Sequence, residues 1–314
     1  MKRVVFFVGA TAFLFATMEV ALKLAGSSLD PLQMTFLRFL IGGLMLVPLA
    51  IDETRKSGYH LNKYDLGWLT LVGIMGIPVS MLCFQLAVQR CNAATAAALF
   101  CLNPLFTMVI AHFFTSEKMD RLKTIAFIIG LFAAFLMIRV WDMQEGNSTA
   151  GIILILTAAV TFSVYSVMGK QSIARIGTFT QTSLNFILGS LVLLIIMIPT
   201  GHPVLEGVIS NWKIVAYCGI VVTGLGYMFY FLAIRYSDAT TGGVAFFIKP
   251  AIAPFLAVIV LSEDIYWNTV IGIILLLEAS AITLWDSLKL KSADSDNQKL
   301  KIQNINIQKS DSQK

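Results

Sequence analysis

Long apolar stretches separated by short polar segments run along almost the whole chain. A helix that crosses a bilayer needs roughly 20 mostly apolar residues. The polar separators contain Gly, Pro, Asn, Asp and Lys and leave no room for a soluble domain. The pattern predicts an all-α integral membrane protein with about ten transmembrane helices, at residues 4–25, 32–51, 67–89, 93–114, 122–140, 150–171, 179–199, 212–235, 240–261 and 266–286.

The two ends of the chain differ from this pattern. Residues 287–314 are polar, lack aromatic side chains and cannot bury a core, which predicts a disordered tail. The basic Met1-Lys2-Arg3 start followed by an apolar run resembles a signal peptide. However, the apolar run continues past Glu19 and Lys23, which favours a retained first transmembrane helix.

Composition and charge agree with a membrane protein. The chain is 57% hydrophobic and only 13% charged, whereas soluble domains carry about 25% charge. The net charge of +5 could suggest a nucleic-acid partner. The basic residues lie at the edges of apolar stretches rather than on one stripe, so we expect the lipid bilayer and no nucleic acid as partner.

The distribution of Lys and Arg predicts the topology. With the N-terminus inside, thirteen basic residues fall in inside segments and only three, Arg90, Arg139 and Lys213, fall outside. Basic residues favour the cytoplasmic side, so both termini are expected to be cytoplasmic in a multi-pass protein of the cell membrane. Two termini on one side also require an even number of helices.

The two halves of the chain repeat one another. A shift of 146 residues superposes Ala93 on Ala239, Thr95 on Thr241, Phe100 on Phe246, Pro104 on Pro250 and Glu117 on Glu263. A shift of 147 superposes the earlier residues Phe15 on Phe162, Lys23 on Lys170, Phe39 on Phe186 and Gly42 on Gly189. Each half has five helices, so the second must be inverted relative to the first, as in many transporters. We expect one repeat at 1–140 and the other at 150–286.

These motifs resemble a known family. They are Phe36-Leu37-Arg38-Phe39 and two copies of an Ala-Thr…Pro…Ser-Glu pattern, one ending at Glu117 and one at Glu263. They are similar to the drug/metabolite transporter superfamily, specifically the EamA domain family. The resemblance implies a central cavity lined by helices 1, 3, 4, 6, 8 and 9, and movement of small metabolites. This chain departs from its own symmetry at Lys249, whose counterpart is Asn103.

Lys249 is the sharpest candidate for a substrate-binding residue. It lies near the middle of its helix, where an ionisable group needs a partner or a wet cavity. Pro250 follows and frees a backbone carbonyl one turn earlier. We expect Lys249 to bind an anionic group, and Asn103 to face it and hydrogen-bond substrate. A buried ion pair for Lys249 and a packing role for Asn103 are the alternatives.

Three further ionisable residues lie inside apolar stretches. Glu19 could bind a substrate amine or carry a coupling proton, but it could also pair with Lys23 one helical turn away. Arg38 is expected to pair with an acid or with carbonyl groups. Glu278 falls on a helix that the resemblance places outside the cavity, which favours a structural role.

Other candidates are polar, aromatic or small. Gln85 is a possible polar lining residue, and Glu117 and Glu263 favour a gate or loop tether over substrate binding. Gly242-Gly243 could act as a hinge. Aromatic side chains on the expected cavity helices could contact substrate or serve only in packing: Phe15, Phe162, Tyr165, Tyr227 and Tyr230.

Rival classes find less support. His60, His112 and His202 are far apart, and no motif of a hydrolase or ATPase is visible, so we expect no enzyme, metal or cofactor. The four cysteines show no metal or disulfide spacing. We expect a secondary transporter of an amino-acid-like or other charged solute, exporting by alternating access, as monomer or homodimer. Proton coupling is an option, and a passive facilitator is the alternative.

Overall fold

The protein was analysed as a computed structural model, which describes residues 2–26, 28–114, 119, 121–138, 146–236, 239–279 and 281–282. The described part holds eight helical spans long and apolar enough to cross a membrane, and two shorter apolar helices at Ile248–Leu261 and Trp267–Ala279. This confirms an all-α membrane protein. The spans are α1 (Lys2–Ala16) with α2 (Met18–Ala25), α3 (Pro31–Ser57), α4 (Lys63–Ile74) with η1 (Met75–Met81) and α5 (Leu82–Val88), α6 (Ala93–Phe100) with α7 (Asn103–Phe114), α8 (Arg121–Ile138), α9 (Thr149–Ile176), α10 (Thr178–Met197), α11 (Trp212–Ala216) with η2 (Tyr217–Leu225) and α12 (Gly226–Tyr236), and α13 (Ala239–Leu261).

Local sequence signals begin and end these helices. Asp30 accepts hydrogen bonds from the amides of Leu32 and Gln33 at the start of α3, where Pro31 occupies the first turn. Gly58 ends the same helix in the left-handed conformation, with φ of 66°. Asn62 and Asp65 form a reciprocal capping box at the start of α4. These caps fix where α3 begins and ends and where α4 begins.

Two spans contain π-helical segments at corresponding places in the two halves. The segment η1 interrupts the third span and η2 interrupts the eighth. Pro78 lies within η1, and proline lacks the amide that a regular helix requires. In η2 the Thr223 hydroxyl donates to the carbonyl of Cys218, five residues earlier. Both segments pack against spans of the opposite half.

Close glycine contacts hold the halves together in a symmetric pattern. A Cβ on Gly189 of α10 would meet the carbonyl oxygen of Gly73 in α4 at 2.5 Å. The repeat counterpart of Gly189 is Gly42 of α3, whose added Cβ would meet Thr223 of η2 at 2.6 Å. Such small residues let helix backbones approach closely in membranes. Each half therefore packs its second span against the third span of the other.

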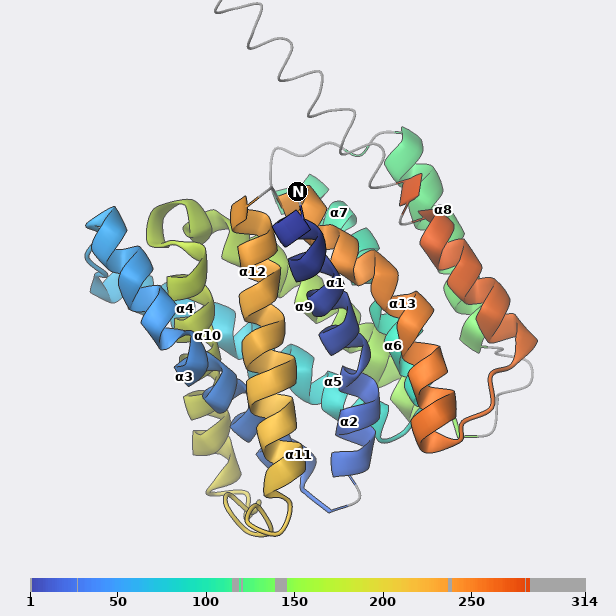
Figure 1. The fold of residues 1–314 in the computed structure, drawn as a ribbon, viewed down its shortest axis with the longest axis horizontal. Coiled ribbons are helices and arrows are strands. Elements are labelled where there is room, and N and C mark those ends of the chain that lie inside the picture. Colours follow the sequence, from blue (N-terminus) through green and yellow to red (C-terminus); the bar gives the residue numbers. More distant parts are fainter. Residues whose placement is uncertain are drawn as a thin grey trace, which may run out of the picture.

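The fifth and tenth spans lie together at the periphery. Figure 1 shows α8 beside the red helix Trp267–Ala279 at one edge of the bundle. The Asn268 amide donates to the Leu136 carbonyl at 3.1 Å, and Gly272 packs against Met137. Glu278 is exposed on this peripheral helix. Its position agrees with the expectation that these two spans stay outside the cavity.

Some predicted features fall outside the described residues. These are the tail at 287–314, Glu117, and the surroundings of Gly242-Gly243, although both glycines lie within α13.

By the alternation of spans, α1, α4, α8, α10 and α13 begin on one side, which we call the N-terminal side. The other is the opposite side.

Candidate functional site

A cavity of about 320 Å³ lies among spans of both halves. It extends from the middle of the bundle towards the end of α9 and the start of α10, on the N-terminal side. Its lining combines aromatic rings with hydroxyl and amide groups, as small-molecule sites commonly do. The lining residues are Asn103, Pro104, Thr107, Phe162, Tyr165, Ser166, Gly169, Ile173, Gln181, Thr182, Tyr227, Tyr230, Phe231 and Phe246.

A break in the fourth span places Asn103 at the inner end of this cavity. The helix α6 ends at Phe100 and α7 begins at Asn103. The Asn103 side chain donates to the Phe100 carbonyl at 3.0 Å, which stabilises the break. The carbonyl of Asn103 accepts hydrogen bonds from Thr107 at 2.8 Å and Ser163 at 2.7 Å. Asn103 therefore shapes the cavity as well as lining it.

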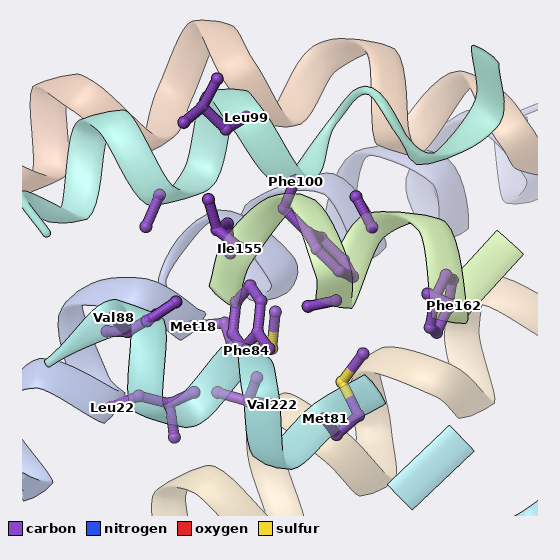
Figure 2. Close-up of a cluster of buried hydrophobic side chains, with 14 of the residues drawn as sticks. Met18, Leu22, Met81, Phe84, Val88, Leu99, Phe100, Ile155, Phe162 and Val222 are labelled. Atoms are coloured by element: carbon purple, nitrogen blue, oxygen red, sulfur yellow. The ribbon is translucent and has the colours of Figure 1, made fainter. Parts of the chain in front are cut away.

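Aromatic rings close the inner end of the cavity in two related pairs. Phe15 and Phe246 have ring centroids 5.5 Å apart, and their repeat counterparts Phe162 and Phe100 are 5.4 Å apart. Phe100 also meets Phe84, with centroids 4.7 Å apart. Figure 2 shows Phe100 and Phe84 facing each other, with Phe162 further along on α9. These rings form an aromatic layer beside the cavity, which Phe162 and Phe246 line.

A buried ion pair lies next to this aromatic layer. The Lys249 Nζ donates to Glu19 Oε1 at 2.5 Å, and both side chains are almost fully buried. The ammonium group also lies 5.8 Å from the Phe84 ring centroid and 5.6 Å from that of Phe100. The pair joins α2 to α13, the first span to the ninth. Asn103 lines the cavity, whereas Lys249 is not among its lining residues.

A second ion pair joins the same spans closer to the opposite surface. Lys23 Nζ lies 2.6 Å from Glu263 Oε1. The Glu263 carboxylate also accepts from the backbone amides of Ala93 and Ala94 at 2.9 and 3.3 Å. These are the first residues of α6, where an anion is favoured. Glu263 thus ties three elements together, and the proposed local pair of Glu19 with Lys23 is wrong because each has a distant partner.

The predicted site residues divide into two groups in the structure. Asn103, Phe162, Tyr165, Tyr227 and Tyr230 line the cavity. Phe15 stands behind this lining, 5.1 Å from Tyr227 by ring centroids. Glu19, Lys249 and Gln85 are buried away from it.

The cavity also contains residues and spans that the sequence did not single out. Gln181 and Thr182 come from α10, the seventh span, whereas the first and third spans contribute no lining residue. Thr107, Ser166 and Phe246 were also missed. Phe246 could have been found, since its counterpart Phe100 was already noted and each lies three residues before Asn103 or Lys249.

Among the described residues, no group of three His, Cys, Asp or Glu side chains gathers in a way that could hold a metal ion. The lining of the cavity offers aromatic faces, hydroxyl groups and amides for binding a small molecule.

Comparison with known proteins follows the same division into halves. The model of the EamA-like transporter family matches twice, at residues 2–139 and 149–285. The chain belongs to the EamA-like transporter family. An uncharacterized transporter of Clostridium kluyveri is 34% identical over 90% of this chain and 93% of its own length. The uncharacterized transporter YoaV of Bacillus subtilis is 25% identical over 82% of this chain and 88% of its own length.

A plant protein and a solved structure also match this chain over most of its length. The WAT1-related protein At1g25270 of Arabidopsis thaliana is 24% identical over 94% of this chain and 92% of its own length. One crystal structure superposes with a TM-score of 0.65 at 18% identity, covering 92% of this chain and 99% of that one. The double EamA match establishes the predicted superfamily and the two inverted repeats. This EamA-family chain is a membrane transporter.

Proposed function

We propose that this EamA-family protein is a secondary transporter that exports a small charged or zwitterionic metabolite by alternating access. The N-terminal side is taken as cytoplasmic, from the charge bias of the loops. In the conformation described here the cavity is then open to the cytoplasm, where an exporter loads its substrate. The opposite side is closed by the aromatic layer and two ion pairs.

The observation that carries this proposal is a difference between equivalent positions. Glu19 and Lys249 make a buried ion pair, whereas their repeat counterparts Ser166 and Asn103 line the open cavity. Inverted repeats commonly exchange conformations when a transporter turns from one side to the other. The outward-open state would therefore separate α2 from α13 and close α7 against α9.

The same exchange of conformations between the repeats indicates which residues would contact the substrate on each side. Asn103, Phe162, Tyr165, Tyr227 and Tyr230 would contact it from the cytoplasmic cavity. The counterparts of the cavity-lining residues Phe162, Ser166, Phe231, Phe246 and Asn103 would line the outward cavity, namely Phe15, Glu19, Gln85, Phe100 and Lys249. Glu19 would become hydrated in that state and could then take up a coupling proton.

The proposal is tested first by ligand binding and then by measurement of substrate flux. A thermal-shift screen of the purified protein against amino acids, amines and organic anions selects a substrate for proteoliposomes. Wild-type protein should then show saturable flux that is accelerated by substrate on the far side, whereas a passive channel would show neither behaviour. Lys249→Ala should insert normally and lose transport. Normal flux through that variant would refute its assignment to the site.

A cross-link provides an independent test of alternating access. Cysteines introduced in place of Lys23 and Glu263, in a background without other cysteines, should be bridged by a short bis-methanethiosulfonate, which forms a reducible disulfide with each thiol and releases two sulfinate groups. The bridge should stop flux, and reductive cleavage should restore it. Flux that continues through the bridged protein would contradict a mechanism that needs these spans to separate.

A further inference from the structure

Arg38 carries a buried guanidinium group that has no acidic partner among the described residues. Its side chain is 1% exposed. Within the described chain its Nε and Nη2 have no hydrogen-bond partner, and no ion pair to Arg38 is present. Its nearest polar contact is Nη1 to the Met18 sulfur at 3.6 Å, and its guanidinium carbon lies 4.3 Å from the Phe39 ring centroid. The acid or carbonyl groups expected to pair with Arg38 are therefore not found among the described residues.

The charges around Arg38 do not balance. Arg38 and Glu19 act on one another electrostatically, and Glu19 is also paired with Lys249. Two cations thus share one carboxylate, and Glu19 Oε2 has no hydrogen-bond partner within the described residues. Buried charges are costly unless they are paired and hydrogen-bonded. The arrangement has one positive charge too many, and a single anion would neutralise it.

A buried amide adds to the unpaired polar groups in this part of the bundle. Gln85 lies on α5 next to Phe84, whose ring is close to Lys249. The Gln85 side chain is fully buried, and neither its oxygen nor its nitrogen has a hydrogen-bond partner among the described residues. Buried amides without partners are rare in native proteins and call for an explanation.

The repeat indicates how these groups become accessible. Glu19, Lys249 and Gln85 correspond to Ser166, Asn103 and Phe231, all of which line the cavity in this structure. Arg38 corresponds to Asn185 of α10, which is buried against Gly73 of α4. When the halves exchange conformations, Glu19, Gln85 and Lys249 would border the outward cavity. Arg38, whose guanidinium group contacts Met18 next to Glu19, would be reached from that cavity.

We infer that Arg38 and Lys249 bind a carboxylate group of the transported solute from the outward cavity, with Gln85 as an additional hydrogen-bond donor. This inference rests on the proposed function and extends it to a substrate class. A guanidinium group can hold a carboxylate with two parallel hydrogen bonds, which suits it to this role. Glu19 replaces the solute carboxylate on Lys249 when the outward side is closed.

Charge selects among possible solutes. An organic monoanion brings the cluster of Glu19, Arg38 and Lys249 to neutrality, a zwitterion leaves it positive, and an amine adds a further positive charge. The cluster therefore favours a solute that carries a carboxylate without a compensating ammonium group.

The inference is tested by ligand binding to the full-length protein in detergent. The probes are aliphatic and aromatic carboxylates at millimolar concentration, each paired with the amide, amine and amino acid of the same skeleton. At least one carboxylate should raise the melting temperature more than its matched probes do. No shift with any carboxylate, or equal shifts with the matched amides or amines, would overturn the inference.

Two variants separate a binding role of Arg38 from a structural one. In Arg38→Met the affinity for the carboxylate should fall roughly 10- to 100-fold, as expected for loss of charged hydrogen bonds. The melting temperature without ligand should stay the same or rise, because an unpaired buried charge is removed. Arg90→Met, at the partly exposed end of the third span, should keep the wild-type shift. A fall in the unliganded melting temperature of Arg38→Met, or an unchanged carboxylate shift, would assign Arg38 to structure.

The experiments distinguish failure of the carboxylate site from failure of the transport mechanism. Carboxylate binding that depends on Arg38, together with absence of accelerated exchange in proteoliposomes, would refute alternating access and retain the anion site. Exchange of an amine or a neutral solute without carboxylate binding would refute the anion site and retain the transporter.

Discussion

Phe39 and Phe186 occupy the same position in the two halves, and their rings touch edge to face with centroids 4.8 Å apart. Only residues on a two-fold axis can contact their own counterparts in this way. The contact therefore locates the pseudo-two-fold axis between α3 and α10. Beside it the Ser183 hydroxyl donates to the Gly43 carbonyl at 2.8 Å, which joins the same two helices.

The glycine contact between α4 and α10 should tolerate no side chain. Gly189→Ala would place a Cβ 2.5 Å from the Gly73 carbonyl oxygen, so backbone must move. Overpacking of this kind costs about 1–3 kcal/mol, and we expect a lower melting temperature in detergent. Gly67→Ala on α4 is the matched control, because no atom lies within 4 Å of its added Cβ. Equal melting temperatures for the two variants would contradict the close crossing.

The Glu19–Lys249 pair should show strong coupling in a double-mutant cycle. Glu19→Gln leaves a buried ammonium group without its carboxylate, and breaking a buried pair costs about 3–5 kcal/mol. Adding Lys249→Met should recover most of that stability while transport remains lost. Asp52→Asn, in the exposed pair with Lys56, should change stability by no more than about 1 kcal/mol. Independent, additive effects of the two buried substitutions would contradict the pairing.

Breaking the Lys23–Glu263 ion pair should expose the thiol group of Cys91. Lys23 donates to the Cys91 carbonyl at 2.8 Å as well as to Glu263. Burial raises the pKa of the Cys91 thiol, so little reactive thiolate forms at neutral pH. In Glu263→Gln the region should open, the pKa should return towards its ordinary value, and labelling by an impermeant maleimide should become faster. Peptide mass spectrometry measures the rate.

The control for this labelling experiment lies on the other side of the membrane. Asp52→Asn should leave the labelling of Cys91 as slow as in the unmodified protein, because Asp52 lies in the last two turns of α3, away from the contact of Lys23 with Cys91. A labelling rate that is already high in the unmodified protein would mean that this closure is absent.

Filling the cavity should stop transport without unfolding the protein. Ser166 lines the cavity on α9, and Ser166→Trp would place an indole in a space of about 320 Å³. We expect loss of substrate-induced thermal shift and of flux, with a melting temperature near that of the unmodified protein. Ile153→Trp is the control, since Ile153 is 60% exposed on the same helix. Unimpaired flux in the Ser166 variant would move the substrate path elsewhere.

Hydrophobic patterning was sufficient to predict the spans and the repeat. Apolar runs of bilayer length mark each helix, and the shared Pro and Ser-Glu positions mark the duplication. The pattern did not reveal the π-helical segments or the break between α6 and α7. These depend on how Pro78 and Asn103 meet neighbouring backbone, which composition along one span does not contain.

The candidate site was only partly predictable, for a reason that lies in conformation. Lys249 and Asn103 were expected at one level and facing one another, because they are equivalent in the repeat. Equivalent residues share an environment only when the two halves have the same conformation. Here Glu19 and Lys249 join the halves in a buried ion pair, whereas their counterparts Ser166 and Asn103 line a cavity. The polar start of α10 was overlooked because Gln181 and Thr182 resemble ordinary residues at a helix end.

The pairing of Glu19 with Lys249 spans 230 residues of sequence. During synthesis at about 5–20 residues per second, roughly 10 to 50 s separate the appearance of the two side chains. The Lys249 ammonium group is therefore made long after the carboxyl group with which it pairs. A chain that ended before Lys249 would lack this partner of Glu19.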